Sequence, residues 1–325
     1  MRRTFVLLTA ALFTGALAMP PASAADEGFT IKDPRITESS GLAASRQHPG
    51  VYWTHNDSDD GAFLYAVDSR TGETVATLTL TGVGTPRDVE AISIGPGNEI
   101  YVGDIGDNLG GGWQHVWIYR LPEPKTLKDR TVAATQYVVT YADGARDAES
   151  LIVHPKTGRV YIVDKNENGG HLYAGPEKLS ASGGNVFTRI AAVPDLEATD
   201  AALSPDGQQL VVRSYFGAIA YDWNDGRIEK RGRLSVPFLG QGESVTYTAD
   251  GSKLMYGAEG SESPVRPGDL PEGSKPAGTG SPSNEASSAG GDDEDDSVVR
   301  AGRGVLAVAV ACAALLGLSR LRRRK

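Results

Sequence analysis

The chain has 325 residues, of which 40 are Gly, 18 are Pro and only one is Cys. A single cysteine excludes an intramolecular disulfide framework and any zinc site built from several cysteines. Residues 1–24 and 300–325 carry nine basic residues and no acidic one, which leaves 23 basic against 41 acidic residues, a charge of −18, in residues 25–299. We therefore expect no nucleic-acid partner, because this acidic middle would repel a phosphate backbone.

The N-terminus has the pattern of a secretory signal peptide. Arg2 and Arg3 are followed by an apolar run over residues 5–18 and by Ala-Ser-Ala at 22–24. A basic start, a short apolar core and a small-x-small end are typical of such a peptide. An uncleaved membrane anchor is the alternative, and the short apolar run disfavours it. The sequence therefore predicts a signal peptide over residues 1–25 and a secreted protein.

One structural unit recurs five times in the middle of the chain. An acidic or hydroxyl residue precedes a short apolar strand, a turn with Pro or Gly follows, and a second apolar strand comes next. Pro presets φ in such turns, and Gly adopts a positive φ without strain. The units are spaced by 50, 59, 51 and 43 residues, and they start at Ser40, Glu90, Glu149, Asp200 and Glu243.

This repeat predicts the fold class. A period of roughly 40 to 60 residues with about four strands per unit is typical of propeller blades. We therefore expect an all-β fold, a five-bladed β-propeller over residues 26–265. Six blades are possible if the long second unit contains a further blade, and a β-sandwich with a small second domain is the other alternative. The fifth unit is short of one strand, and we expect residues 28–31 to supply it and so remove a free sheet edge.

The C-terminal part has the composition of a stalk followed by a membrane anchor. Residues 266–300 are rich in Gly, Ser, Pro and acidic residues, and such a composition buries too little apolar surface to fold, which predicts a disordered stalk. Residues 301–319 are mostly apolar, which predicts a short transmembrane helix that spans by tilting. The basic residues 320–325 then form a cytoplasmic tail. We expect a type I single-pass protein of the cell membrane, held by one C-terminal span, with the propeller outside the cell.

The five unit starts also predict a metal site. The first strand of each blade lines the central channel, so the side chains at these starts converge at one channel mouth. Four carboxylates packed together repel one another, and a hard cation relieves the repulsion. Ca²⁺ takes roughly six to eight oxygen ligands, often as a pentagonal bipyramid. The alternative is that each acid only caps the turn of its own strand. The predicted Ca²⁺ ligands are Ser40, Glu90, Glu149, Asp200 and Glu243.

Further polar residues are expected on the same face. Two adjacent units share Arg-Asp-x-Glu, at 87–90 and 146–149, and these arginines either hold a phosphate or carboxylate beside the ion or pair with the neighbouring acids. The loops after the second strands lie on this face and are rich in Asp and Asn. The candidate ligand-binding residues are Arg87, Arg146, His55, Asp57, Asp104, Asp107, Asn108, Asp164, Arg213 and Glu259.

Two resemblances accompany these units. Over residues 27–265 the strand–turn units resemble those of secreted, membrane-anchored bacterial β-propeller proteins of the WD40-, YVTN- and NHL-like kind, which implies the fold. The predicted ring resembles that of the calcium-activated nucleotidases (apyrases), which are five-bladed with a central calcium. That resemblance implies a calcium held by the five ring residues. Asp200 stands where the nucleotidases have a serine.

Two functions follow from these features. The first is a cell-surface binding module for a ligand or a protein, stabilised by calcium and without catalysis, because no group of residues supplies a separate acid, base and nucleophile. The alternative is a calcium-dependent hydrolase of phosphate esters, nucleotides or lactones, with the ring ion as Lewis acid. A glycosidase would need two opposed carboxylates, which the ring does not single out.

Overall fold

The computed structural model describes residues 27–58 and 60–274. The predicted signal peptide, nearly all of the predicted stalk, the transmembrane segment and the basic tail lie outside these residues. Among the residues that are described, none belongs to a helix with the length and apolar character needed to cross a membrane.

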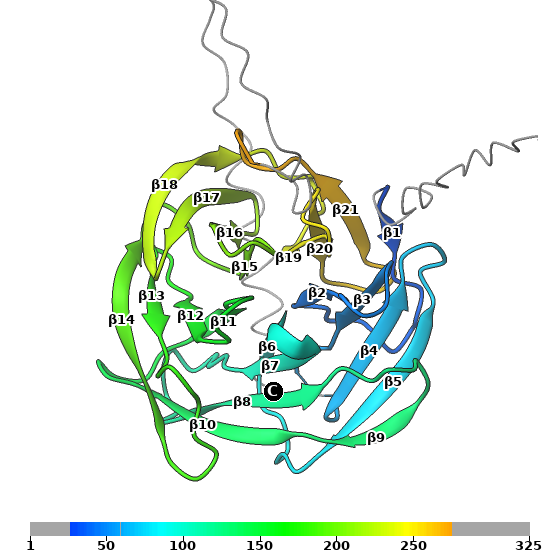
Figure 1. Ribbon diagram of the computed structural model, residues 1–325, viewed down its shortest axis with the longest axis horizontal. Coiled ribbons are helices and arrows are strands. Elements are labelled where there is room, and N and C mark those ends of the chain that lie inside the picture. Colours follow the sequence, from blue (N-terminus) through cyan, green and yellow to red (C-terminus); the bar gives the residue numbers. More distant parts are fainter. Residues whose placement is uncertain (1–26, 59, 275–325) are drawn as a thin grey trace, which may run out of the picture. The chain divides into compact units, whose positions relative to one another are not determined.

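The described residues are all-β and propeller-like, with 21 strands and one 3₁₀ turn, η2 (Pro96–Asn98). Figure 1 shows the strands in groups around a common centre. The innermost strands are β2 (Leu42–Ala44), β6 (Val89–Ile94), β11 (Ala148–Val153), β15 (Asp200–Leu203) and β19 (Gly242–Tyr247). The second strands are β3 (Val51–Thr54), β7 (Glu99–Asp104), β12 (Val160–Asp164), β16 (Gln209–Ser214) and β20 (Leu254–Ala258). The third strands are β4 (Phe63–Asp68), β8 (Val116–Pro122), β13 (Gly170–Ala174), β17 (Gly217–Asn224) and β21 (Pro264–Gly268). The outer strands are β5 (Thr74–Thr81), β10 (Thr135–Tyr141), β14 (Asn185–Val193), β18 (Arg227–Leu234) and β1 (Phe29–Thr30), and β9 (Arg130–Ala133) lies outside β5.

The turns between the first and second strands form where the sequence predicts them. In the turn at 204–207 the N–H of Gly207 donates to the carbonyl of Ser204 at 2.8 Å, and Gly207 has φ of +70°. The turn at 248–251 repeats this geometry, with Gly251 donating to Thr248 at 2.8 Å. Each turn returns the chain antiparallel to itself, so β15 pairs with β16 and β19 pairs with β20.

The innermost strands form a closed ring around the channel. β2 contacts β6, β6 contacts β11, β11 contacts β15, β15 contacts β19, and β19 returns to β2. The predicted closing strand is confirmed, because β1 pairs antiparallel with β21 through Phe29 opposite Val265. The folded part continues through β21 and on to Ser274, whose hydroxyl donates to Gln209 Oε1 at 2.7 Å. It thus extends beyond residue 265, where the sequence predicts the propeller to end and the stalk to begin.

The long second unit contains an unusual strand, β9. This strand pairs in parallel with β5, with Leu78 opposite Arg130. A second parallel pair joins β10 to β14, which merges two groups of four strands into one eight-stranded sheet. Both pairings cover outer edges that would otherwise expose unpaired backbone groups.

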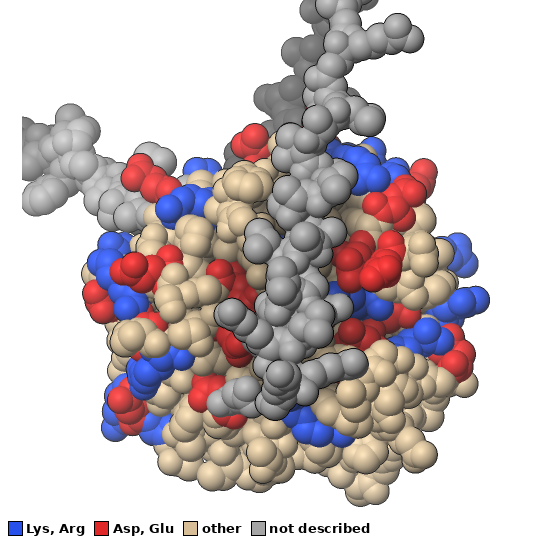
Figure 2. Space-filling model, turned by 180° about the vertical axis from the view of Figure 1, so that it is seen from behind, with Lys and Arg blue, Asp and Glu red and all other residues tan. Residues whose placement is uncertain are grey.

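The surface carries mixed charges and a few large apolar side chains. Figure 2 shows acidic and basic side chains interspersed over one face of the described domain. Leu109, Phe216 and Phe238 are 72%, 64% and 88% exposed. Their loops lie between β7 and β8, β16 and β17, and β18 and β19. Because the strands alternate in direction, these loops share the end at which the innermost strands begin.

Replacing Phe29 tests the closing strand. Phe29 is buried and its ring lies 5.3 Å from that of Tyr52. Phe29→Ala is expected to lower the free energy of unfolding by about 3 kcal/mol, the lower end for a buried aromatic side chain. Val186→Ala, at a half-exposed position on β14, serves as the control and should change it little. Equal losses in chemical denaturation for the two variants would contradict a stabilising role for β1.

Candidate functional site

The residues that start the five units lie at one mouth of the channel. Three of the innermost strands have a register shift at their starts, between Val89 and Ala91, between Ala148 and Ser150, and between Gly242 and Val245. Such β-bulges turn a side chain away from its regular direction. All five predicted ring residues are buried, with exposed fractions of 7% or less: Ser40, Glu90, Glu149, Asp200 and Glu243.

Three carboxylates from two neighbouring strand groups form the tightest acidic group among the described residues. Asp57 from the loop after β3 meets Asp88 and Glu90, and one oxygen of each lies within 4.8 Å of the others. The backbone N–H of Val89 donates to the carbonyl of Asp57 at 2.9 Å, which ties that loop to β6. The side-chain amide of Asn108 donates to both oxygens of Asp88, at 3.1 and 3.0 Å. We call Asp57, Asp88 and Glu90 the carboxylate cluster.

The carboxylate cluster holds more negative charge than its surroundings can solvate. Burial raises the pKa of Asp57 to about 9, and repulsion from Asp88 adds to the effect. Burial also raises the pKa of Asp88. The pKa of Glu90 lies well above its ordinary value, first through burial and then through the charges of Glu149 and Asp57. Without a cation the cluster therefore retains a proton near neutral pH.

The carboxylate cluster has the features that a divalent cation needs. Oδ1 of Asp57 is buried and has no hydrogen-bond partner. Gly106 lies against the cluster, and a Cβ atom there would come within 2.7 Å of both Asp88 Oδ2 and Glu90 Oε1. Only a glycine lets the backbone lie this close to the oxygens without displacing them. An all-oxygen donor set suits Ca²⁺, Mg²⁺ or Mn²⁺, so the residues present fit a hard cation.

An ion pair lies beside the carboxylate cluster. Lys165, which follows β12, pairs through Nζ with Glu149 Oε1 and donates to the phenol oxygen of Tyr215 at 2.8 Å. Burial raises the pKa of Glu149 to about 8, and the ammonium of Lys165 opposes this rise. Burial alone lowers the pKa of Lys165, but the attraction of Glu149 outweighs it and leaves the pKa raised. Lys165 and Glu149 are close enough to Glu90 to shift its pKa as well.

These contacts divide the predicted five-membered ring. Only Glu90 joins the carboxylate cluster, and Glu149 is occupied by Lys165. Asp200 accepts hydrogen bonds from the backbone N–H groups of Ala201 and Val245, each at 2.7 Å, so it joins β15 to β19. The other two have contacts close in sequence: Ser40 Oγ donates to the carbonyl of Glu38 at 3.4 Å, and Glu243 accepts from Gln241 at 3.2 Å.

The two arginines of the Arg-Asp-x-Glu motifs are held by their neighbours. Arg87 lies between the rings of Trp113 and Trp117, at 4.0 and 3.8 Å from their centres, and donates to a backbone carbonyl. Arg146 pairs with Asp143 at 2.8 Å and with Asp164 at 3.3 Å. The geometry thus corresponds to the second of the two alternatives for Arg146, pairing with nearby acids.

His55 is a buried neutral side chain. It is 1% exposed, and its Nδ1 lies 3.1 Å from the carbonyl of Asn56. Burial lowers its pKa to about 4. The ring of His55 therefore contributes no charge to a ligand at neutral pH.

Most of the other predicted ligand residues hold the loops in place. Asp104 accepts from Tyr119 Oη at 2.5 Å, and Asp107 accepts from the backbone N–H of Trp113 at 2.6 Å. Asp164 accepts a hydrogen bond from the backbone N–H of His171 at 2.5 Å, and Arg213 donates one to the carbonyl of Ser244 at 2.5 Å. Glu259 accepts a hydrogen bond from the side-chain amide of Gln241. Of the predicted set, Asp57 and Asn108 lie at the carboxylate cluster.

Four residues at this mouth were not among the predicted site residues: Asp88, Gly106, Lys165 and Tyr215. Asp88 is part of the repeated Arg-Asp-x-Glu motif, and that repetition could have identified it as a site residue. Lys165 stands in a loop rich in Asp and Asn, where a lone basic residue opposite a ring of acids is informative. Tyr215 is an aromatic residue in the loop after a second strand, which places it near this face, whereas nothing in the sequence distinguishes Gly106 from other loop residues.

Comparisons with known proteins identify similar structures only. No family model matches the chain, and no curated protein sequence matches it. A candidate 6-phosphogluconolactonase from Bacteroides uniformis is 15% identical, with 74% of this chain and 70% of that one covered and a TM-score of 0.40. A gluconolactonase from Xanthomonas campestris is 14% identical, with 70% and 71% covered and a TM-score of 0.44. The hydrazine synthase of Kuenenia stuttgartiensis is 12% identical, with 69% and 74% covered and a TM-score of 0.40. At these values the comparisons assign no activity and no residue role to this chain.

Proposed function

We propose that this protein is a five-bladed propeller that binds a divalent cation at the carboxylate cluster and hydrolyses a small ester there. The observation that carries the proposal is the cluster itself, with the buried carboxylates of Asp88 and Glu90, the half-buried carboxylate of Asp57 with its unpartnered oxygen, and the close approach of Gly106 to the oxygens. Five groups of four antiparallel strands around one ring support the blade number. The strand β9 adds to the first group and starts no sixth blade.

Calcium is the proposed cation. Asp57, Asp88 and Glu90 would hold it, and Ca²⁺ accepts such an irregular oxygen set more readily than Mg²⁺, which requires nearly ideal octahedral geometry. Extracellular calcium modules bind in the range of about 10⁻⁴ to 10⁻³ M, which suits a secreted domain. When bound, the ion would supply Lewis acidity to a substrate oxygen.

The ion pair next to the carboxylate cluster provides the other groups that the proposed hydrolysis needs. Lys165 places a buried positive charge where an oxyanion of the substrate would develop. Tyr215 accepts a hydrogen bond from Lys165 and so fixes the ammonium in place. The carboxylate form of Glu149, whose pKa is raised to about 8, is proposed to take the proton of the attacking water and to pass it to the leaving oxygen of the ester, because a base works best when its pKa lies near the working pH. The substrate class is a phosphate ester, a nucleotide or a lactone.

We also propose that the protein acts outside the cell. The signal-peptide pattern of residues 1–25 and the apolar stretch 301–319 with its basic tail support export and anchoring as a type I membrane protein. Both features lie outside the described residues. Protease treatment of intact cells is expected to remove the propeller and leave the C-terminal tail protected.

The experiment that tests the hydrolase is a substrate screen. The full chain in detergent is incubated with phosphate esters, nucleotides and lactones, with calcium and with chelator. We expect hydrolysis that needs calcium and that falls by a factor on the order of 100 in Asp88→Asn, which removes one ligand and one charge. Asp195→Asn, an exposed acid paired with Lys230, is the control. A rate of hydrolysis in chelator equal to that in calcium would contradict the proposal.

A calcium-stabilised binding module is the second candidate function. The exposed side chains of Leu109, Phe216 and Phe238 stand on loops at the same end of the channel, where they could contact a bound partner. A calcium-dependent rise in melting temperature without hydrolysis in the screen would favour this function. Turnover of any substrate class in the screen would favour the hydrolase.

A further inference from the structure

The opposite end of the channel contains a separate cavity. Its lining comes from all five innermost strands, β2, β6, β11, β15 and β19, and its volume is about 50 Å³. A water needs roughly 10 to 15 Å³ of such volume, so the cavity has room for a few waters or one small ion. Ser93 lies three residues beyond Glu90 on β6, which separates the cavity from the carboxylate cluster by roughly 10 Å along the strand.

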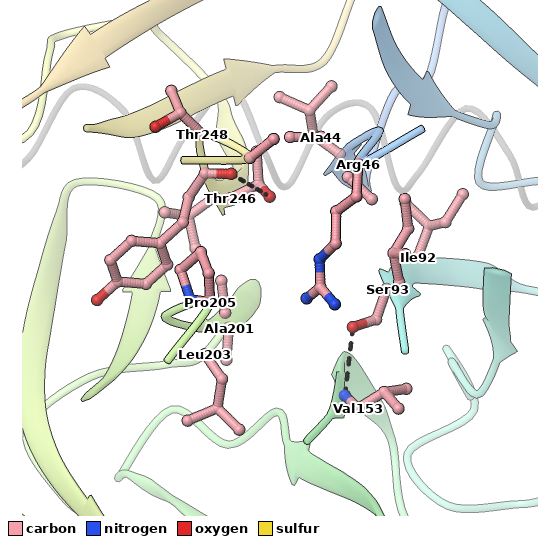
Figure 3. A pocket seen from close by; sticks show the side chains of 17 residues that line it. Ala44, Arg46, Ile92, Ser93, Val153, Ala201, Leu203, Pro205, Thr246 and Thr248 are labelled. Carbon is pink, nitrogen blue, oxygen red and sulfur yellow. Dashed lines mark hydrogen bonds between the residues drawn. The ribbon is translucent and has the colours of Figure 1, made fainter. Parts of the chain in front are cut away.

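One cation points into this cavity. Figure 3 shows the guanidinium of Arg46 in the middle of the cavity, beside Ser93. No Asp or Glu is among the lining residues. Arg46 is half-buried, and none of the ion pairs found among the described residues includes it. Burial lowers its pKa, and Glu123 is the one charge that opposes this.

One oxygen of the Glu123 carboxylate is engaged elsewhere. Its Oε1 accepts hydrogen bonds from Ser45 Oγ at 2.5 Å and from Trp53 Nε1 at 2.7 Å. Its Oε2 is buried without a hydrogen-bond partner, and it acts on Arg46 through space. None of the hydrogen bonds and ion pairs found among the described residues joins Glu123 to Arg46, so the guanidinium donors are free for another acceptor. A half-buried arginine in a cavity without a carboxylate is costly unless an anion accompanies it.

A hydroxyl donor stands next to the guanidinium. Ser93 Oγ accepts a hydrogen bond from the backbone N–H of Val153 at 3.2 Å, which leaves its own proton to donate. Thr246, also in the lining, donates its hydroxyl proton to the carbonyl of Tyr247 at 3.2 Å. Arg46 and Ser93 thus bring free donors together in the cavity, and the lining also includes Tyr247, whose hydroxyl has no hydrogen-bond partner. A planar guanidinium with a hydroxyl matches the geometry of an oxyanion.

We propose that this end of the channel binds a small oxyanion of phosphate or sulfate size, held by the guanidinium of Arg46 and the hydroxyl of Ser93. The site is distinct from the carboxylate cluster and does not depend on the proposed hydrolase. The channel then has opposite charge at its two ends, with the carboxylates at one mouth and Arg46 at the other. The oxyanion is either a free inorganic ion or the end group of a larger molecule.

Calorimetric titration of the full chain in detergent tests this site. Inorganic phosphate and sulfate are titrated at constant ionic strength with chelator present, so that calcium plays no part. A titration with glycerol 3-phosphate tests whether the site accepts a phosphate that is the end group of a larger molecule. We expect saturable phosphate binding that weakens at least ten-fold in Arg46→Met and several-fold in Ser93→Ala, as befits the loss of a charged and a neutral hydrogen-bond partner. Arg70→Met, an exposed arginine paired with Asp68, is the control and should bind as the wild type does.

The controls separate binding from folding. Arg46→Met removes a half-buried charge without an ion-pair partner, so its melting temperature without phosphate is expected to equal or exceed that of the wild type. Arg46→Lys keeps the charge but loses the two-pronged geometry, and it should bind with intermediate affinity. Wild-type phosphate affinity in Arg46→Met would overturn the proposal, as would the absence of saturable binding of every oxyanion by the wild-type chain. Binding of inorganic phosphate but not of glycerol 3-phosphate would identify a free ion as the ligand.

Discussion

Calcium is expected to raise the melting temperature of the wild-type protein by about 5 to 10 °C at a concentration of roughly 100 times its dissociation constant, and this rise should disappear in Asp88→Asn. The reason is that the ion binds only the folded state, where Asp57, Asp88 and Glu90 lie within reach of one another. Asp88→Asn removes one ligand and its charge while leaving a side chain of nearly the same shape. Differential scanning calorimetry with calcium and with chelator measures the effect.

Gly106→Ala makes the same test without changing any charge. The added methyl group would come within 2.7 Å of oxygens of Asp88 and Glu90, so it displaces the oxygens that would hold the ion. Gly184→Ala is the matched control, because a Cβ there has nothing within 4 Å. A calcium-induced rise in Gly106→Ala equal to that of Gly184→Ala would place the ion elsewhere, and a wild type unaffected by chelator would remove the calcium site altogether.

The protonation of the carboxylate cluster adds a pH signature to this test. The folded-state pKa of Asp57 is raised to about 9 from an ordinary value of 3.8, so the folded protein binds this proton more tightly than the unfolded chain does. In chelator, the free energy of unfolding should therefore fall as the pH rises from about 4 towards 9. Calcium replaces the proton, and saturating calcium should flatten this fall. A pH profile that is the same with and without calcium would contradict the assignment.

At pH 9, Lys165→Met is expected to lower the free energy of unfolding by about 3 to 5 kcal/mol, because it leaves Glu149 buried without its counter-charge. Both side chains of this pair are only 9% exposed. Lys230→Met breaks an exposed pair with Asp195, whose side chains are 40% and 49% exposed, and should cost about 1 kcal/mol or less. Chemical denaturation of the two variants measures the difference.

The pH dependence of Lys165→Met separates charge from packing. The pKa of Glu149 is already raised to about 8, and removal of the ammonium raises it further. At pH 5 the carboxyl of Glu149 is then protonated and the loss should be small, whereas at pH 9 its ionisation competes with folding and the loss should be large. The double variant Lys165→Met/Glu149→Gln removes both charges and should recover most of the stability. An equal loss at pH 5 and pH 9 would show that packing, and not charge, is what Lys165 contributes.

The strand order of this protein follows largely from its sequence. Alternating apolar residues and turns such as Ser-Pro-Asp-Gly at 204–207 act over a few neighbours, so they can be recognised without knowledge of the fold. The need to cover a sheet edge predicts the pairing of β1 with β21, and the structure confirms it. The parallel pairing of β9 with β5 was not predicted. This pairing depends on which outer strand lies next to the long connection that contains β9, and no local sequence pattern specifies that strand.

The composition of the site was decided by tertiary structure. The sequence placed Glu90 and Glu149 at equivalent positions, and both are indeed buried at the channel mouth. Their partners differ, because the loops that meet them come from different strand groups: Asp57 reaches Glu90 from the loop after β3, and Lys165 reaches Glu149 from the loop after β12. Repeats in a sequence determine which side chains occupy equivalent positions in successive strand groups. Which charges end within a few ångströms of each other depends on bulges, loop paths and burial, and these exist only once the ring of strands has closed.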